Sequence, residues 1–299
     1  MVNEDNTMLS ADFKQVDVFT NRPFRGNPVA VVLNASHLRG EEMQQIANWT
    51  NLSETTFVLP PLDSKADYQV RIFTPGSELP FAGHPTIGTA HALLEAGMIK
   101  ARNGRIVQEC GAGLISLSVT VLPEGGESIA FELPEPAIHP LSEEQTDRLE
   151  RILGCHLDRT LSPALVDVGA RWIVARASDT RSVLGTHPDY AQLAEHDAGM
   201  RVTGVCLFGE YEAEEGMHIE VRSFAPSCGV SEDPVCGSGN GSVAAFLRHH
   251  QVPLPIDGQI VSTQGRRLGR DGRLNLTVES GRILVGGQAV TCISGTIAF

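Results

Sequence analysis

Residues 220–226, EVRSFAP, repeat a pattern that first occurs at residues 69–75 as QVRIFTP. Both segments have the branched and aromatic composition of a strand that ends at a proline. Each is followed by a glycine-containing turn and a small-residue helix, AGHPTIGTAHALLEAG in the first half and CGSGNGSVAAFLRHH in the second. ISLSVTV (115–121) and RLNLTVE (273–279) continue the correspondence. The same order of elements, repeated half a chain length later, predicts a duplicated unit.

The duplication predicts two similar α+β lobes, each with a helix inserted against a mixed β-sheet. We expect an N-terminal lobe over residues 1–135, completed by the last strand at 287–299, and a C-terminal lobe over residues 136–286. Acidic residues before an apolar period predict a helix at 41–49. Strands of the first half are predicted at 16–20, 28–33, 68–75, 105–109, 113–122 and 128–133.

The charge of the chain argues against partners that carry many negative charges. The 299 residues have a formal net charge of -13 and a pI near 5.2. Nucleic acids and anionic membranes are bound by clustered Lys and Arg, so we expect neither as a partner and favour a small molecule. The sequence begins with polar and acidic residues, and it has no apolar run long enough to span a membrane. We therefore expect a soluble, cytoplasmic protein.

The spacing of cysteine and histidine argues against a metal site. The six cysteines include no CxxC pair, and the ten histidines form no HExxH motif. Scattered cysteines in a chain of this length are typical of free thiols in a reducing compartment. We expect no bound metal, although ligands from distant segments stay an open alternative.

The two glycine-rich turns suggest a binding site for an anion. Gly83 and Gly237 stand at the start of the two matching helices, where backbone N–H groups have no intrahelical acceptor and the helix dipole is positive. Each turn could also be an ordinary connection into a helix. GSGNGS has no lysine and does not fit a phosphate-binding loop, which disfavours a nucleotide. A small carboxylate or a developing enolate is the better candidate.

Four motifs together resemble the PhzF family of phenazine-biosynthesis-like isomerases, which is similar to diaminopimelate epimerase and proline racemase. They are VDVFTNRPFRGNPVAVVL, NLSETTFVL, RIFTPGSELPFAGHPTIGTAHAL and SEDPVCGSGNG, in this order and spread over both halves. The resemblance implies a diaminopimelate epimerase-like α+β fold of two pseudo-symmetric lobes, each a mixed β-sheet or barrel wrapped around a central helix. It places the site in the cleft between the lobes. It also implies no cofactor and a homodimer.

The resemblance places the catalytic glutamate of the family on Glu54, within NLSETTF. In the phenazine enzyme such a residue shifts a proton within trans-2,3-dihydro-3-hydroxyanthranilate. A carboxylate that is desolvated in a closing site has a raised pKa, and it can both take and return a proton near neutral pH. The alternative is a solvated carboxylate at the start of a strand.

His84 in FAGHP and Asp233 in SEDP fall on the two supporting polar positions of the family. The resemblance implies that they orient an amino or hydroxyl group of the substrate and relay protons. The backbone N–H groups of Gly83, Gly237 and Ser238 would donate hydrogen bonds to the carboxylate of the substrate. Structural alternatives are a helix N-cap for Asp233, a turn residue for His84 and a capping hydroxyl for Ser238. Further residues that could line the site are Arg71, Arg222 and Asn27.

Cys236 departs from the phenazine enzymes, which usually have threonine at this point. The epimerase and racemase relatives place one of two catalytic cysteines before a similar turn, but Ala82 occupies the place of the second one here. A thiol at a helix N-terminus is expected to have a depressed pKa. Cys236 is therefore a candidate substrate-binding residue, and its participation in catalysis stays open.

Three functions follow from these residues. The first is a cofactor-independent isomerase of phenazine-biosynthesis type that acts on a small carboxylated substrate through Glu54. The second is an amino acid or hydroxy acid epimerase or racemase that Cys236 assists. The third is a binding protein that keeps the site without turnover.

Overall fold

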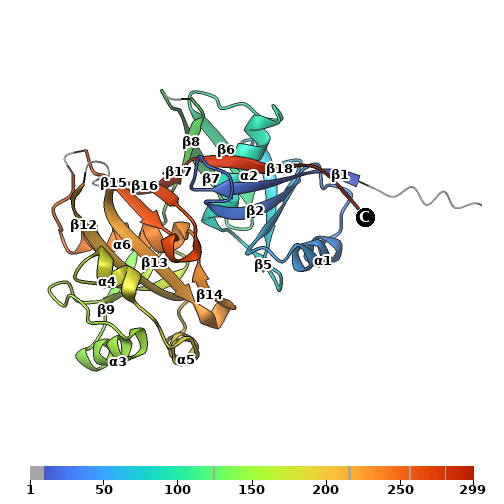
Figure 1. The fold of residues 1–299 in the computed structure, drawn as a ribbon. Helices are drawn as coiled ribbons and strands as arrows, with labels where there is room; N and C mark the ends of the chain where they lie inside the picture. The colour runs from blue at the N-terminus through green and yellow to red at the C-terminus, as the bar shows by residue number, and fades with distance from the viewer. Residues whose placement is uncertain (1–9, 124, 215–216, 256, 280) are drawn as a thin grey trace, which may run out of the picture. The chain divides into compact units, whose positions relative to one another are not determined.

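The computed structural model describes residues 10–123, 125–214, 217–255, 257–279 and 281–299 (Figure 1). The chain divides into two compact units. Unit 1 comprises the described part of Met1–Phe24, together with Pro28–Ile129 and Ala289–Phe299. Unit 2 comprises Arg25–Asn27 and Ala130–Gln288. The chain thus passes from one unit to the other after Ile129, ahead of the change that we expected between residues 135 and 136.

Unit 1 combines a mixed set of strands with two helices. In chain order its elements are β1 (Ser10–Val18), β2 (Asn27–Val32), α1 (Gly40–Thr50), β3 (Thr55–Leu59), β4 (Tyr68–Phe73), β5 (Glu78–Leu79), α2 (Gly83–Glu95), β6 (Arg105–Cys110), β7 (Gly113–Val121) and β18 (Ala289–Ala298). The last strand, β18, pairs with β1 in antiparallel fashion. β8 (Glu127–Glu132) contains the passage into unit 2.

Unit 2 has the same kinds of elements. They are β9 (Ala137–Pro140), α3 (Glu143–Leu153), β10 (Ala164–Asp167), β11 (Arg171–Arg176), α4 (Thr180–Gly185), α5 (Tyr190–Met200), β12 (Gly204–Glu214), β13 (Met217–Ala225), β14 (Val230–Asp233), α6 (Gly237–His249), β15 (Gln259–Gln264), β16 (Gly272–Val278) and β17 (Ile283–Gly287). Two short 3₁₀ helices are η1 (Pro226–Cys228) and η2 (Arg266–Leu268).

Strand pairing follows the same order in both units. In unit 1, β2 and β3 are parallel, β3 and β4 antiparallel, β4 and β6 parallel, and β6 and β7 antiparallel. In unit 2, the same four relations hold for β11, β12, β13, β15 and β16. A short strand and a helix, β5 and α2 or β14 and α6, precede the fourth strand of each series. The predicted α+β fold with a repeated order of elements is confirmed.

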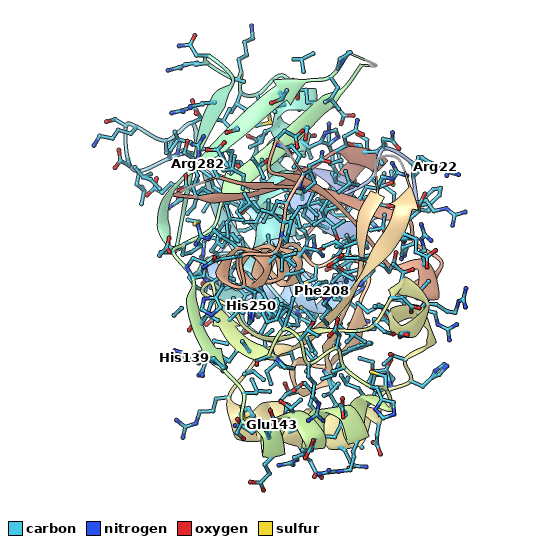
Figure 2. All side chains as sticks on the ribbon, turned by 90° about the vertical axis from the view of Figure 1, so that its left-hand side faces the viewer. Arg22, His139, Glu143, Phe208, His250 and Arg282 are labelled. Atoms are coloured by element: carbon cyan, nitrogen blue, oxygen red, sulfur yellow. The ribbon has the colours of Figure 1, made fainter. Side chains whose placement is uncertain are left out.

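Helices α2 and α6 form the centres of their units. Ten of the thirteen residues in each helix are buried. A Cβ atom on Gly88 of α2 would lie 2.4 Å from a methyl group of Val29, so glycine permits the close approach of this helix to β2. Phe208 and His250, labelled in Figure 2, lie beside α6, where both rings contact Phe246. The cores therefore surround these two helices.

Helix α2 begins at Gly83, directly after an extended Ala82. Pro85 lies in the first turn, where a missing N–H costs no hydrogen bond. The GHP turn is therefore part of the helix.

The two units also share an arginine–glutamate pair. Arg71 on β4 contacts Glu78 on β5 at 2.7 Å through two nitrogens, and its guanidinium lies over the ring of Phe73. Arg222 on β13 and Glu232 on β14 form the same bidentate pair at 2.9 and 2.8 Å, with the guanidinium over a phenylalanine ring. These two arginines therefore join strands, which is a structural role.

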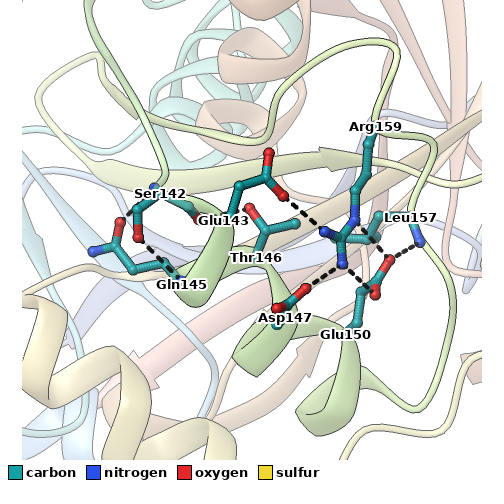
Figure 3. A network of polar contacts seen from close by, with 8 residues as sticks. All are labelled: Ser142, Glu143, Gln145, Thr146, Asp147, Glu150, Leu157 and Arg159. Carbon is teal, nitrogen blue, oxygen red and sulfur yellow. Dashed lines mark hydrogen bonds and ion pairs between the residues drawn. The ribbon is translucent and has the colours of Figure 1, made fainter.

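Helix α3 has a well-defined start and a charged outer face (Figure 3). Ser142 and Gln145 form a capping box at its N-terminus. Arg159, beyond the helix, makes ion pairs with three of its carboxylates, which belong to Glu143, Asp147 and Glu150. These contacts fasten the following loop to the helix surface.

No helix of the described residues is both long and apolar enough to cross a membrane.

The two arginine–glutamate pairs differ in burial, which predicts different contributions to stability. The side chains of Arg222 and Glu232 are each 4% exposed, whereas those of Arg71 and Glu78 are 34% and 42% exposed. Glu232→Ala leaves a buried guanidinium without its carboxylate and should lower the free energy of unfolding by about 3 to 5 kcal/mol. Glu78→Ala, the matched control, should cost less than about 1 kcal/mol. Urea unfolding followed by circular dichroism measures both, and equal losses would contradict this assignment.

Candidate active site

Glu54 and His84 are brought together in unit 1. Glu54 directly precedes β3, and its carbonyl accepts a hydrogen bond from the N–H of Ala30. His84 is the second residue of α2. Atom Oε2 of Glu54 lies 3.3 Å from Nε2 of His84, and the side chains are 16% and 7% exposed. The strand start and the helix start therefore place a carboxylate against an imidazole that is almost closed to solvent.

The imidazole of His84 is neutral at physiological pH. Burial lowers its pKa to about 3, and a hydrogen bond to the backbone of Pro28 only partly opposes this effect. Because Pro28 has no N–H, the imidazole must donate to its carbonyl oxygen. His84 is therefore part of the helix and a neutral hydrogen-bonding group beside Glu54, and the alternative of a turn residue is wrong.

Buried polar side chains fasten the start of α2 to the strands beneath it. Thr89 donates to Thr56 of β3 over 2.8 Å. Gln108 of β6 donates to Thr86 over 3.0 Å and accepts from the hydroxyl of Tyr68 over 3.0 Å. These residues hold His84 and Gly83 in place relative to Glu54. Sequence reasoning missed them, because polar residues within an apolar period give no sign of their partners.

Gly83 is the first residue of α2, and no side chain caps this end of the helix. The N-cap residue, Ala82, has no polar atoms in its side chain. The backbone donors of the first turn therefore do not compete with a capping side chain. This arrangement suits an anion better than a capped helix does.

Asp233 ends β14 in unit 2, and its carboxylate is held by two donors. Atom Oδ1 accepts from the N–H of Val235 over 2.9 Å and from Nδ2 of Asn27 over 3.1 Å. Burial raises the pKa of this carboxyl to about 6, although hydrogen bonds from the N–H of Val235 and from the side chain of Cys236 favour the ionised form. Asp233 does not cap α6, so the N-cap alternative is wrong.

Cys236 is the N-cap of α6, and its thiol is buried. Its sulfur accepts from the N–H of Gly239 over 3.3 Å. Burial raises the pKa of the thiol well above its usual value, and Asp233 and Cys206 raise it further. The depressed pKa expected for a thiol at a helix start is therefore wrong, because loss of hydration and a neighbouring carboxylate outweigh the helix dipole.

Gly237 and Ser238 form the first turn of α6. Gly237 is buried and begins the helix, as Gly83 begins α2. The hydroxyl of Ser238 accepts from the indole Nε1 of Trp172 over 3.0 Å. It also lies 3.6 Å from the sulfur of Cys236. Ser238 is therefore oriented by an indole, and the capping position belongs to Cys236.

Gln264 connects Asp233 with Cys236 and Asn240 through hydrogen bonds. Sequence reasoning did not identify Gln264 as part of this region. Its Nε2 donates to the carbonyl of Asp233 over 2.8 Å. Its Oε1 accepts from the N–H of Cys236 over 3.1 Å and from Nδ2 of Asn240 over 2.7 Å. A glutamine at the end of a strand carries no motif, so only the contacts reveal this function.

The predicted residues fall into two groups, one in each unit. Unit 1 brings together Glu54, His84 and Gly83, and unit 2 brings together Asp233, Cys236, Gly237 and Ser238. Of the three further candidates, Asn27 contacts Asp233, whereas Arg71 and Arg222 contact glutamates of neighbouring strands. That both groups bind one substrate stays a prediction.

The second unit cannot carry a copy of Glu54. Thr55 pairs with Phe73, and Val205 pairs with Phe224, so the position equivalent to Glu54 is Gly204. A Cβ atom at Gly204 would lie 1.9 Å from the carbonyl oxygen of Phe224. No side chain fits there, and the duplication is chemically asymmetric for this reason.

A cavity of about 330 Å³ lies elsewhere in unit 2. Its lining residues are Asp147, Glu150, Arg151, Gly154, Cys155 and His156. None of the predicted site residues is among them. Within the described residues, no three histidine, cysteine or acidic side chains gather as they would around a metal ion.

Comparisons with known proteins show which family the chain belongs to. A family model for phenazine biosynthesis-like proteins, PhzC-PhzF, matches residues 16–295. The chain is 43% identical over 296 residues to "Antisense-enhancing sequence 1" of Schizosaccharomyces pombe, covering 96% of this chain and 99% of the relative. It is 33% identical over 266 residues to trans-2,3-dihydro-3-hydroxyanthranilate isomerase of Pseudomonas aeruginosa, covering 88% and 89%.

Solved structures show the same fold. A phenazine biosynthesis protein of the PhzF family from Bacillus anthracis superimposes with a TM-score of 0.86 at 25% identity, covering 98% of this chain and 100% of the other. A hydroxyproline epimerase from Agrobacterium vitis, 17% identical, shares the fold with a TM-score of 0.62 and coverage of 97% and 93%. The predicted epimerase-like fold is confirmed, and relatives named as isomerases support an isomerase activity. The chain belongs to the PhzC-PhzF family of phenazine biosynthesis-like proteins.

Proposed function

We propose that this protein is a cofactor-independent isomerase that shifts a proton within a small carboxylated substrate, with Glu54 as the acid/base group. The observation that supports this most directly is the contact of 3.3 Å between Glu54 and the neutral, buried His84. The single N–H of the neutral imidazole is donated to the carbonyl of Pro28, so Nε2 can accept a hydrogen bond from Glu54 when this carboxyl group is protonated. A carboxyl group held in this way suits reversible proton transfer.

The proposed reaction needs a single proton and no change of oxidation state. Glu54 takes a proton from a carbon of the substrate, and the electrons of the broken C–H bond enter the conjugated system as a delocalised anion of enolate or dienolate type. The carboxylic acid then returns the proton to another carbon of that system. One residue serves both steps, and His84 keeps the carboxyl oriented between them.

The substrate is proposed to be a carboxylate that also carries an amino or hydroxyl group. The uncapped start of α2 and the start of α6 supply backbone donors for an anion at Gly83, Gly237 and Ser238. The carboxylate of Asp233 is proposed to accept a hydrogen bond from the amino or hydroxyl group. The compound named for the relative from Pseudomonas aeruginosa, trans-2,3-dihydro-3-hydroxyanthranilate, has these groups and is the first candidate.

Replacement of the acid/base group tests the central step. Glu54→Gln keeps the shape of the side chain but removes its ability to accept a proton. We expect incorporation of deuterium from deuterated water into the substrate to fall by about 10² to 10⁴-fold. Mass spectrometry of the recovered substrate and product measures this, beginning with the phenazine intermediate. Exchange at an unchanged rate would remove Glu54 from the mechanism.

The pKa values predict the acid side of the pH profile. The proposed role of Asp233 as an acceptor is strongest when its carboxyl group is ionised, and the pKa of this group is raised to about 6. We therefore expect kcat/KM to fall as the pH drops through about 6, approaching a tenfold loss per unit. His84, with a pKa near 3, should add no titration between pH 5 and 8. A rate that instead rises as the pH falls through 6 would show that Asp233 works in its protonated form.

Cys236 distinguishes this proposal from a cysteine-assisted epimerase or racemase. The thiol is buried and protonated, and the equivalent residue of α2 is Ala82, so a reaction with two thiols lacks its second base. Cys236→Thr should change kcat/KM by less than about threefold, because the thiol makes no proton transfer in the proposed mechanism. Steady-state kinetics measures this. A loss of several hundredfold would favour the epimerase or racemase.

A further inference from the structure

Asn27 has a position that the proposed mechanism does not yet use. The residue is fully buried, at 0% exposure, and it begins β2. It belongs with Arg25 to a segment of three residues in unit 2, while the residues on both sides belong to unit 1. A buried amide must be matched to hydrogen-bonding partners, so its contacts are informative.

The side-chain amide of Asn27 holds both ends of the turn that carries Asp233. Its Nδ2 donates to Oδ1 of Asp233 over 3.1 Å and to the carbonyl oxygen of Val235 over 3.0 Å. Both partners are acceptors, so only the nitrogen of the amide can face them. The two hydrogens of one NH₂ group thus fix the carboxylate relative to the backbone two residues later.

The segment around Asn27 is itself held in place by the turn after η2. The guanidinium of Arg25 donates to the carbonyl of Gly269 over 2.9 Å. The N–H of Asp271 donates to the carbonyl of Arg25 over 2.8 Å. These two contacts of Arg25, two residues before Asn27, therefore hold the start of the segment in place independently of Asp233.

We propose that Asn27 is a positioning residue for the reaction, which acts by orienting the carboxylate of Asp233 and stabilising its ionised form. This role rests on the proposed function for its effect on turnover, but the effect on the carboxylate itself does not depend on turnover.

The surroundings of Asp233 determine the direction of the effect. Burial raises the pKa of the carboxyl, and Glu232 on the same strand raises it further, although Glu232 is paired with Arg222. The neighbouring sulfur groups are Cys236 at the start of α6 and Cys206 on β12. Hydrogen bonds from the N–H of Val235 and from the thiol of Cys236 favour the ionised form, and the amide of Asn27 is a further donor at 3.1 Å. Removal of the amide of Asn27 should therefore raise the pKa of Asp233 above about 6.

The full-length protein, labelled with ¹³C at aspartate carboxyl groups, allows a direct test. NMR titration follows the Asp233 signal, which is assigned by its loss in Asp233→Asn. In Asn27→Ala we expect its midpoint to move up by roughly one unit, since a hydrogen bond to a charged group has about this strength. The acid limb of kcat/KM should move to higher pH by the same amount.

Asn240→Ala is the matched control. Asn240 is also a buried asparagine at 0% exposure, and its Nδ2 contacts the same loop at the carbonyl of Cys236 and at Gln264. These two acceptors differ from the carboxylate of Asp233. The midpoint of the Asp233 titration should therefore be unchanged in Asn240→Ala. Asn27→Leu, which keeps the volume of the side chain, replaces Asn27→Ala if that variant does not fold.

An unchanged midpoint in both Asn27 variants would overturn the proposal, and so would an equal shift in Asn240→Ala, which would indicate a general loosening of the loop. The titration does not require catalysis. If Glu54→Gln left proton exchange unchanged, the proposed function would fail, while the titration would still decide the role of Asn27.

Discussion

Buried polar side chains need partners, and in each unit this need fixes where the central helix begins. Gln108 reaches from β6 to Thr86 near the start of α2, and Ser262 reaches from β15 to Asn240 near the start of α6. A buried hydrogen bond of this kind adds little net free energy to folding, but loss of one partner destabilises the fold more strongly because the other group stays buried without a hydrogen bond. The helix starts are therefore held to the sheet by contacts that tolerate little displacement, and His84, Gly237 and Ser238 of the candidate site lie on these starts.

The two units repeat this construction and differ in what they place on it. Unit 1 has His84 and, from the neighbouring strand, Glu54. Unit 2 has Ser238 in the place of His84 and Gly204 in the place of Glu54, where the close carbonyl of Phe224 leaves no room for a side chain. A proton-transferring carboxylate at this position is thus possible in one unit alone. The proposed mechanism with one acid/base residue is consistent with this asymmetry, whereas a symmetric mechanism with two bases is not.

Burial, more than proximity to a helix start, determines the charge of these groups. His84 stays neutral, Asp233 titrates near pH 6, and the thiol of Cys236 stays protonated. In each case the group is withdrawn from water, which disfavours its charged form. The expectation of a thiolate at Cys236 failed for this reason. The dipole of the helix acts on the group, but it does not replace the lost hydration.

The sequence by itself determined the repeated order of elements and the fold class, and it predicted a set of candidate site residues. The repeated QVRIFTP and EVRSFAP segments, each followed by a glycine turn and a helix, correspond to β4 with α2 and β13 with α6. Such patterns can be read because strand and helix periods and turn residues act over a few neighbouring positions. The motif around Glu54 and the FAGHP turn also identified two side chains that the fold brings to 3.3 Å.

Only the tertiary structure decided how these side chains are supported and charged. Asn27 and Gln264 lie far from Asp233 in the sequence and contact it from two directions. Arg71 and Arg222, which looked equally suited to line a site, form ion pairs with glutamates of adjacent strands instead. Partners of this kind come from separate strands and loops, and the depth of burial that sets a pKa depends on all of them together. A pattern of neighbouring residues shows neither the hydrogen-bonding partners of a side chain nor its depth of burial. Both depend on packing between segments that are distant in the chain.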